Sequence, residues 1–486
     1  VARTFLLSIV LAVILLASQY PSVVVAQATP ANPILVVVNN SSPNPFGMFI
    51  GEILQTECLN EFQIEELGNV DGIYLSNFDV VILAETPLTS PQVTMLEDYV
   101  TAGGNLIAMR PDKELAGLFG LTDASTTLTE GYLLIDTASG PGAGLVGETI
   151  QFHGTADQYT LSGAAALATL YTDAATATPY PAVALNSVGV SGGQAAAFTY
   201  DLARSVVYSR QGNPAWEGME RDGSAPLRSD DMFYGDAAGD PQLDWIDLSK
   251  VAIPQADEQQ RLLANLILNL NFDRKPLPRF WYFPRGEKAV VIMTGDDHGV
   301  TDVDGRLDRH IALSPAGCSV ADWECVRSTA YLYTSSALTD AQALNYHNLG
   351  FELALHVTTG CADYTPASLA SDYATQLAGF AATWPSIPAP STERTHCVAW
   401  SDWAGQAHVE LDNGIRLDTN YYFWPSGWVT NQPGLFTASG MPMRCADLDG
   451  TLIDVFQAAT QMTDESDQAY PFTADTLLDR ALGPQG

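Results

Sequence analysis

The sequence has few basic residues. Lysine and arginine together number 21, only four of them lysine, against 56 aspartates and glutamates, and the formal net charge is −35. So acidic a surface repels nucleic-acid phosphates and anionic lipid headgroups. We therefore expect no nucleic-acid partner and no attachment to anionic membranes.

Long apolar runs are absent beyond the first 26 residues. Residues 5–17 are almost wholly apolar and follow Arg3, and small residues lead up to Ala26. This is the pattern of a signal peptide cleaved after Ala26. A retained membrane anchor is the alternative, but Pro21 interrupts the run. The sequence predicts a signal peptide at 1–26 and a secreted or periplasmic protein, with no stable membrane insertion after cleavage.

Cysteine is sparse, and no two cysteines form a CxxC pair, which argues against a zinc site made of thiolates. Six cysteines fit an oxidising compartment. The short spacing of Cys318 and Cys325 predicts a bridge that closes a loop. Cys361 and Cys397 are candidates for a second bridge, and the remaining two have no evident partner.

The first half of the chain, residues 30–275, alternates buried-strand and helix patterns. Strands are predicted at 34–38, 80–83 and 105–109, and helices at 46–57 and 90–101, the latter with Ser90 as its N-cap. This alternation predicts right-handed βαβ units and a parallel sheet. A β-rich insertion is expected at about 122–250, and a helix at 257–271 that packs back on the sheet.

The second half, residues 285–486, contains strand-like runs that end in polar residues. They lie at 289–293, 351–356, 393–399, 415–417 and 452–455. Because active sites of β/α barrels lie at the carboxyl ends of the strands, this pattern favours a barrel. The predicted fold class is thus α/β: a doubly wound parallel sheet with a β-rich insertion, then a deformed β/α barrel. The helical pattern at 474–482 is followed by no further strand, which predicts an incomplete barrel.

Two adjacent carboxylates, Asp296 and Asp297, follow the strand pattern at 289–293, and His298 comes next. Neighbouring carboxylates repel one another unless a cation or a shared proton relieves them. A divalent metal ion is the simplest relief. A solvated turn is the alternative.

Three later strand ends carry further candidates. His356 closes one apolar strand, Arg394 and His396 end the next, and Asp418 ends a third. Arg394 could hold a carboxylate in its ionised form. Each histidine alone is more often structural than a ligand. The aromatic run at 421–428 could stack on sugar rings or belong to the core.

Residues 294–297, Thr-Gly-Asp-Asp, resemble the first motif of the polysaccharide deacetylases, carbohydrate esterase family four. His356, Arg394 and Asp418 fall where that family has its second, third and fourth motifs. The resemblance covers roughly residue 284 to the C-terminus. It implies a deformed barrel, a divalent metal such as zinc, and removal of N-acetyl or O-acetyl groups from a polysaccharide or amino-sugar oligomer.

The resemblance also implies residue roles. Asp296 would be the general base, Asp297 and His356 metal ligands, and Arg394 the residue that orients Asp296, with Asp418 as a further catalytic residue. The family's second ligand histidine is replaced here by Gly360. His396 is the expected substitute and His298 the alternative. No histidine follows His408, although the family's last motif supplies a general-acid histidine.

The first half resembles the class I glutamine amidotransferase-like fold, in its variant with a β insertion. The turn that carries the catalytic cysteine in that family is here Arg110-Pro111-Asp112. The other candidate, Cys58, lies in a predicted helical region. The resemblance therefore implies a domain without catalysis of its own, for substrate binding or packing.

The leading hypothesis is a secreted, metal-dependent polysaccharide deacetylase. The alternative is a non-catalytic carbohydrate-binding or cell-surface protein that retains the deacetylase fold, and the missing histidines favour it. A related metallohydrolase acting on another amide or ester is a third reading.

Overall fold

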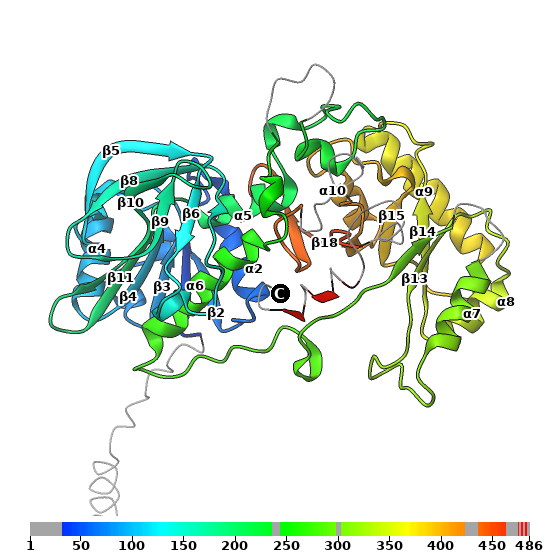
Figure 1. The fold of residues 1–486 in the computed structure, drawn as a ribbon, viewed down its shortest axis with the longest axis horizontal. Coiled ribbons are helices and arrows are strands. Elements are labelled where there is room, and N and C mark those ends of the chain that lie inside the picture. The colour runs from blue at the N-terminus through cyan, green and yellow to red at the C-terminus, as the bar shows by residue number, and fades with distance from the viewer. Residues whose placement is uncertain are drawn as a thin grey trace, which may run out of the picture.

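The computed structural model describes residues 32–235, 244–297, 303–422 and 436–462, together with residues 475, 478, 479, 482 and 483. The fold is mixed α/β and contains two large sheets with parallel strands, one in each half of the molecule (Figure 1). The predicted signal peptide, and most of the helix predicted at 474–482, lie outside the described residues.

The first sheet has nine strands in the order β2-β1-β3-β4-β11-β10-β9-β6-β7. Its parallel part comprises β2 (Phe62–Glu66), β1 (Ile34–Val38), β3 (Val80–Leu83), β4 (Asn105–Met109) and β11 (Gly193–Phe198). Its antiparallel part comprises β10 (Ala177–Val188), β9 (Ala165–Tyr171), β6 (Tyr132–Ile135) and β7 (Ile150–Gln151). A separate pair is formed by β5 (Leu121–Thr129) and β8 (Thr155–Leu161). The three strands predicted at 34–38, 80–83 and 105–109 are confirmed.

Helices cover both faces of this sheet. One face packs against α2 (Phe49–Thr56), α5 (Leu202–Gln211) and α6 (Gln255–Asn271), and the other against α3 (Gly72–Leu75) and α4 (Ser90–Thr101). In β1 the side chains of Ile34, Val36 and Val38 join the first layer and those of Leu35 and Val37 the second. A strand buried on both faces needs apolar residues at every position, which explains its uninterrupted apolar run.

Two details of the helices test the sequence predictions. The helix expected at 257–271 is present as α6 and packs on the first sheet, where Asn105 Nδ2 donates to Leu270 O at 2.9 Å. The expected cap of α4 was wrong by one residue. Thr89, not Ser90, is the N-cap, because Thr89 and Gln92 form a capping box.

Gly193, at the start of β11, lies against the end of α4. A Cβ at this position would collide with the carbonyl oxygen of Val100. We expect Gly193→Ala to lower the free energy of unfolding by about 1–3 kcal/mol, the cost of overpacking a fixed backbone. Urea unfolding checks this, with Gly117→Ala as control, since a Cβ there meets nothing within 4 Å. Equal losses in the two variants would contradict the prediction.

The second sheet has seven strands in the order β12-β13-β14-β15-β16-β18-β17. They are β12 (Thr294–Asp296), β13 (Thr329–Leu332), β14 (Glu352–Val357), β15 (Thr392–Thr395), β16 (Leu417–Asp418), β18 (Leu452–Gln457) and β17 (Met443–Ala446). Only β17 runs antiparallel to its neighbour. The first five strands alternate with α7 (Val303–Leu313), α8 (Asp340–Asn348), α9 (Pro366–Thr383) and α10 (Gly405–Asp412). Within the described ranges the two edge strands, β12 and β17, do not pair with each other, so the sheet is open between them.

The strand predicted at 289–293 was wrong. The strand β12 begins only at Thr294, and Val290, Val291 and Ile292 are 40–60% exposed. Its neighbour β13 begins at Thr329, which pairs with Thr294, so no residue of β13 lies opposite the earlier segment. An apolar run forms a strand only where a partner provides the hydrogen bonds.

Two other predicted strands have different bounds. The strand expected at 393–399 ends at Thr395, because Cys397 and Val398 have φ values of 63° and 47°, outside the extended region. The strand expected at 415–417 is β16, which begins at Leu417. Both differences lie beside candidate functional residues.

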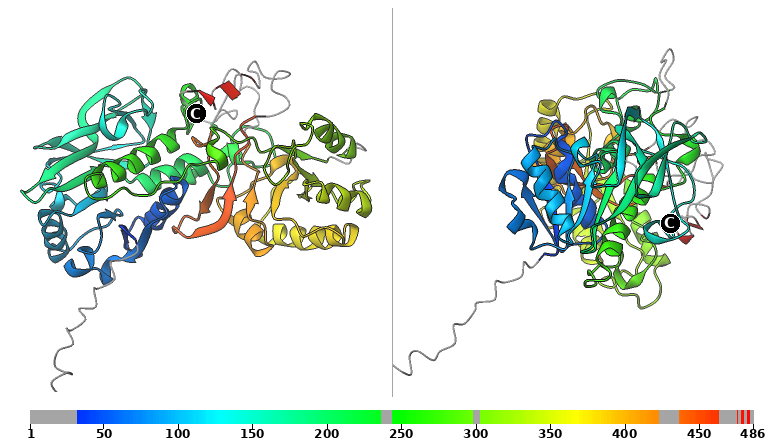
Figure 2. Two further views of the ribbon diagram at one scale, coloured as in Figure 1. Left: turned by 90° about the horizontal axis from the view of Figure 1, so that it is seen from below. Right: turned by 90° about the vertical axis from the view of Figure 1, so that its left-hand side faces the viewer.

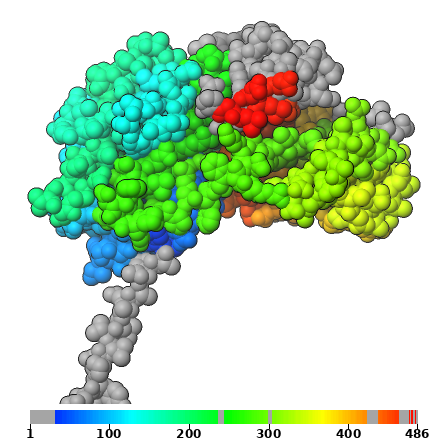
Figure 3. Space-filling view, turned by 60° about the horizontal axis from the view of Figure 1, so that its bottom comes forward, coloured from blue at the N-terminus to red at the C-terminus, as the bar shows by residue number. Residues whose placement is uncertain are grey.

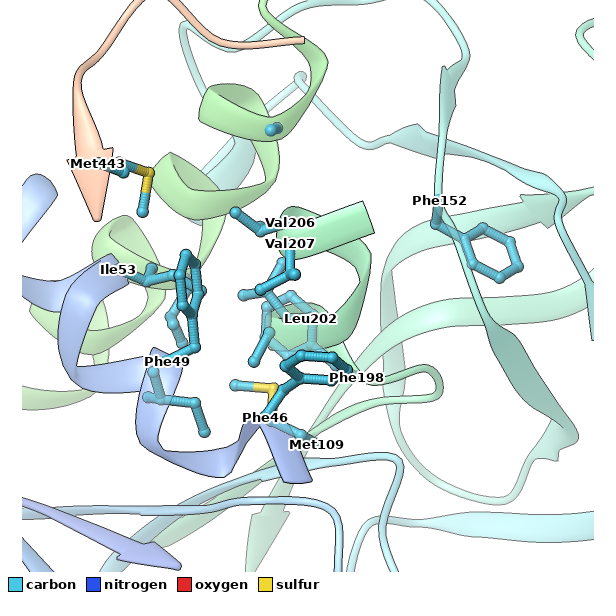
Figure 4. Close-up of a cluster of buried hydrophobic side chains, with 14 of the residues drawn as sticks. Phe46, Phe49, Ile53, Met109, Phe152, Phe198, Leu202, Val206, Val207 and Met443 are labelled. Atoms are coloured by element: carbon cyan, nitrogen blue, oxygen red, sulfur yellow. The ribbon is translucent and has the colours of Figure 1, made fainter. Parts of the chain in front are cut away.

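The two halves share a continuous hydrophobic core. Met443 of β17 reaches the cluster formed by Phe49, Ile53 and Val206 of the first half (Figure 4). Figure 2 shows β17 and β18, in orange, at the side of the second sheet that faces the first half. After α6 the chain crosses to the second half along the surface (Figures 1 and 3). The core thus fixes the second sheet against the first.

Candidate functional site

Four of the predicted site residues lie at or just beyond the ends of neighbouring strands in the second sheet. Asp296 ends β12 and Asp297 follows it, while His356 of β14 pairs in register with Arg394 of β15. The carboxyl ends of parallel strands meet at one edge of a sheet. These residues, which are far apart in the sequence, therefore share that edge.

Arg394 is held by contacts from several directions. Its guanidinium donates to Asp296 Oδ1 at 3.4 Å, to Thr294 Oγ1 at 2.8 Å and to the carbonyl of Thr419 at 3.3 Å. It also lies over the ring of Tyr331, 5.5 Å from the centroid. A guanidinium fixed by so many partners orients the Asp296 carboxylate with little freedom. The structure thus pairs Arg394 with Asp296.

His356 is buried and its ring orientation is set by the backbone. Its Nδ1 lies 2.7 Å from the carbonyl oxygen of Arg394. Because a carbonyl can only accept, Nδ1 carries a proton, and in the neutral ring Nε2 then carries the lone pair. A backbone carbonyl on the far nitrogen is the usual support of a metal-bound histidine.

His396 lies next to His356, as the sequence prediction required. The two ring centroids are 5.3 Å apart and the rings are nearly perpendicular, at 81°. Tyr333 contacts both rings, with centroid distances of 5.0 Å to His356 and 5.4 Å to His396. Burial raises the pKa of Tyr333 to about 12, helped by the charges of Asp296 and Asp297.

Tyr333 was missed by the sequence reasoning. It lies just past the end of β13, two residues after Tyr331, so the two side chains are on the same side of the strand. β13 lies between β12 and β14, which both carry candidate site residues, so residues at its carboxyl end are expected at the same edge of the sheet. The tyrosines of the sequence Tyr-Leu-Tyr at 331–333 were the available signal.

The predicted metal ligands share an edge, but the described side chains do not converge on one point. Among the residues that the structure describes, three groups have ligand atoms within 4.8 Å of one another, and Asp297 with His356 and His396 is not one of them. The donor set itself, one carboxylate and two imidazoles, suits zinc and similar divalent ions. His298, the alternative ligand, lies outside the described residues.

Asp418 lies in a different environment from the one expected. It pairs in register with Glu393, and both are fully buried together with Glu410 of α10. Because side chains alternate along a strand, Glu393 and Asp418 point away from the face that carries Arg394. The structure thus places Asp418 between the sheet and the helices, apart from Asp296.

The three buried carboxyl groups, which we call the carboxyl triad (Glu393, Glu410 and Asp418), are joined by amide donors. Asn420 Nδ2 donates to Asp418 at 2.5 Å and to Glu393 at 2.9 Å, and Gln406 Nε2 donates to Glu410 at 2.9 Å. Burial raises the pKa of all three groups, and the charge of Asp418 adds to the rise for Glu393 and Glu410. Sequence reasoning found only Asp418, since Glu393 and Glu410 lie in ordinary strand and helix patterns.

Of the aromatic run at 421–428, the structure describes the first two residues. Tyr421 is buried, and its ring packs against Trp400 at 5.1 Å and Phe233 at 6.4 Å. Tyr421 therefore belongs to the hydrophobic core, which was the alternative to stacking on sugar rings. Phe423, Trp424 and Trp428 lie outside the described residues.

Both predicted disulfides are confirmed. Cys318 bonds to Cys325, and Cys361 bonds to Cys397 across a separation of 36 residues. Cys361 and Cys397 also form, with His396, one of the groups whose ligand atoms lie within 4.8 Å. The second bridge therefore lies directly beside the candidate site.

In the first half, the turn that follows β4 contains Arg110, not a nucleophile. Arg110 has a φ of 37° and forms ion pairs with Glu85 at 3.0 Å and Asp157 at 3.1 Å. Cys58 lies two residues beyond the end of α2, not within the helix as expected. The turn after β4 is thus held by the two ion pairs of Arg110.

No protein-family model matches the chain, and no curated protein matches it. Solved structures that match include a β-galactosidase from Rahnella sp. R3 (16% identity, TM-score 0.29, 36% of this chain and 29% of that one). A ThuA-like protein from Bacteroides uniformis also matches (11% identity, TM-score 0.31, 52% of this chain and 95% of that one). The chain spans less than a third of the length of that β-galactosidase. TM-scores below 0.5 do not establish a shared fold, so no functional conclusion follows from these matches.

Within the described ranges, no helix combines the length and the apolar character needed to cross a bilayer.

Proposed function

We propose that the chain is a secreted metal-dependent hydrolase that removes acetyl groups from a polysaccharide, and that its second sheet belongs to a deformed β/α barrel. The observation that carries this proposal is the Asp296–Arg394 pair beside two adjacent histidines at one sheet edge. A carboxylate, a fixed guanidinium and paired imidazoles are the groups that metal-assisted hydrolysis of an amide or ester uses. The Thr-Gly-Asp-Asp motif supports acetyl groups on sugars as the substrate class.

Asp297, His356 and His396 would hold the metal. A zinc or similar ion bound there would polarise the acetyl carbonyl and make the attacking water more acidic. His356 suits this role because its Nδ1 donates to the carbonyl of Arg394, which leaves Nε2 of the neutral ring to bind the ion.

Asp296 would accept the proton of the attacking water. Arg394 fixes the carboxylate from one side, and the fixed orientation reduces the entropy lost in reaching the reactive geometry. The leaving nitrogen or oxygen of the sugar needs a proton, and Asp296 can return the one that it accepted.

The proposed function is tested by measuring metal content and acetate release on the purified protein. Acetylated chitin oligomers and peptidoglycan fragments are suitable first substrates. About one divalent ion per chain together with released acetate would support the proposal. A chain that binds these saccharides without metal and without acetate release would favour the non-catalytic carbohydrate-binding protein.

His356→Ala should remove the bound ion, because it deletes an imidazole whose orientation the backbone already fixes. We expect metal affinity to fall by more than the roughly 10–100-fold that loss of an outer-shell contact costs. His408→Ala is the control, since His408 lies on the surface and pairs with Asp447. Unchanged zinc affinity in His356→Ala, measured by competition with a chelator, would remove His356 from the ligand set.

A further inference from the structure

The loops that follow β14 and β15 are joined covalently. Cys361 lies in the loop after β14, the strand that carries His356, and Cys397 lies in the turn after β15, directly after His396. Their disulfide brings the two Cα atoms to 5.5 Å. The two histidines thus belong to segments that one covalent bridge connects.

Three residues of the bridged segments adopt a backbone conformation that is unfavourable for residues with a Cβ. Cys361, Cys397 and Val398 have φ values of 53°, 63° and 47°. Residues with a Cβ rarely occupy this left-handed region, and a β-branched residue such as valine does so least. The turn therefore needs an outside restraint to keep its shape.

A second restraint comes from the first half of the chain. Arg228 Nε donates to the carbonyl of Cys397 at 2.9 Å, and Arg228 forms a backbone bridge with Ala399. The backbone N–H of Trp400 donates to Leu227 O at 2.8 Å. These contacts anchor the turn toward the first half, and the disulfide anchors it toward β14.

The two histidines differ in how they are held. His356 lies inside β14, where the strand pairing and the carbonyl of Arg394 fix it. His396 lies beyond the end of β15, in the turn that contains Cys397. The position of His396 therefore depends on what restrains the turn, whereas that of His356 does not.

We propose that the Cys361–Cys397 disulfide positions His396 beside His356, so that the metal-binding edge is complete only in the oxidised protein. The oxidised sulfurs cannot act as thiolate ligands. Once reduced, they are thiols close to a nitrogen of His396, and with it they form a competing Cys₂His donor set. The redox state of this disulfide thus decides whether His396 binds the metal together with His356. The part of the proposal that concerns metal rests on the proposed function.

The test compares two disulfide deletions in the full chain. In the first, Cys361→Ser is combined with Cys397→Ser, and in the control Cys318→Ser is combined with Cys325→Ser. Co²⁺ affinity, measured by titration, should fall at least about tenfold in the first variant, the lower end of what loss of a supporting contact costs. It should be unchanged in the control, because that bridge closes a separate loop, with a sequence separation of 7 between its cysteines. Equal affinities in the two variants would overturn the positioning role.

Reduction of the wild-type chain offers a second route if the serine variant does not fold. One dithiothreitol supplies two electrons and two protons, which break the S–S bond into two thiols as the reagent closes to a cyclic disulfide. We expect weaker Co²⁺ binding that returns on reoxidation. Tighter Co²⁺ binding after reduction would show instead that the reduced Cys₂His set is the real metal site, and would overturn the proposal.

A measurement that does not depend on metal binding can test the positioning role of the disulfide independently of the proposed function. Amide hydrogen exchange over residues 396–400 should rise at least about tenfold in the Cys361/Cys397 serine variant and stay unchanged in the control, as expected when a restraint on a local segment is lost. If wild-type protein binds no Co²⁺, the proposed function fails while exchange still decides the positioning role. Unchanged exchange over this turn would overturn the proposal even if the protein binds metal.

Discussion

Replacing Asp296 with asparagine is expected to lower acetate release by at least about a hundredfold and to leave metal content unchanged, since general acid–base groups typically contribute about 10²–10⁴-fold. Asparagine keeps the size of the side chain and can still contact Arg394, but it cannot accept a proton. In the variant Arg394 keeps its hydrogen bonds to Thr294 and to the carbonyl of Thr419, which hold the guanidinium in place.

The measurement is acetate released per enzyme at saturating substrate, with metal content determined on the same sample. Asp412→Asn is the control, because Asp412 is exposed at the end of α10. If the Asp296 variant retains full turnover, another group is the base. If it loses its metal, Asp296 is a ligand and the roles of the two aspartates must be exchanged.

Three of the five parallel strands of the first sheet, β1, β3 and β4, were predictable because strands buried on both faces have almost wholly apolar sequences, whereas β2 is only half-buried and was missed. Runs such as 34–38 have no polar position, and few other structures tolerate that. The run at 289–293 has the same pattern, yet it is exposed. Strand formation there depends on a partner, and the first residue of β13, Thr329, already pairs with Thr294. The residue at which the neighbouring strand β13 begins cannot be read from the sequence of residues 289–293.

The site was predictable to the level of which strand ends it occupies. His356 and Arg394 were expected at neighbouring strand ends, and the register pairs them directly. The environment of Asp418 was not predictable, because it depends on Glu393 and on Glu410 of α10. A motif indicates which residue follows a strand, but the direction of its side chain follows from register and from the helix packed behind it.

The carboxyl triad should make the protein more stable at pH 5 than at pH 8, and Glu410→Gln should remove much of that difference. Burial is the main cause of the raised pKa values, to about 8 for Glu393 and about 6 for Asp418, with that of Glu410 well above its usual range. A carboxyl group whose pKa is higher in the folded state holds a proton that the unfolded chain releases. Its stabilising contribution is complete below about pH 4 and is lost as the pH rises through the folded-state value.

The magnitude follows from the number of protons held. Because folded Glu410 holds one proton that the unfolded chain releases, each unit of rise in pH across this window lowers the free energy of unfolding by about 1.4 kcal/mol. Between pH 5 and pH 8 this amounts to roughly 4 kcal/mol. Glutamine keeps the acceptor for Gln406 and Tyr373 and offers a permanent donor toward Asp418, so it mimics the protonated acid. The variant should therefore resemble wild type at pH 5 and be more stable than wild type at pH 8.

Urea unfolding at pH 5, 6, 7 and 8, in the presence of a chelator, measures the two pH profiles. Other buried acids, such as Glu57, whose pKa burial raises to about 7, add the same trend to both proteins, so only the difference between the profiles reports on Glu410. Asp412→Asn, two residues away on α10 but exposed, should keep the wild-type profile. Parallel profiles for wild type and Glu410→Gln would show that Glu410 is ionised in the folded protein. The triad would then need a cation, and stabilisation of wild type by added Ca²⁺ or Mg²⁺ at pH 8, lost in Glu410→Gln, would identify it.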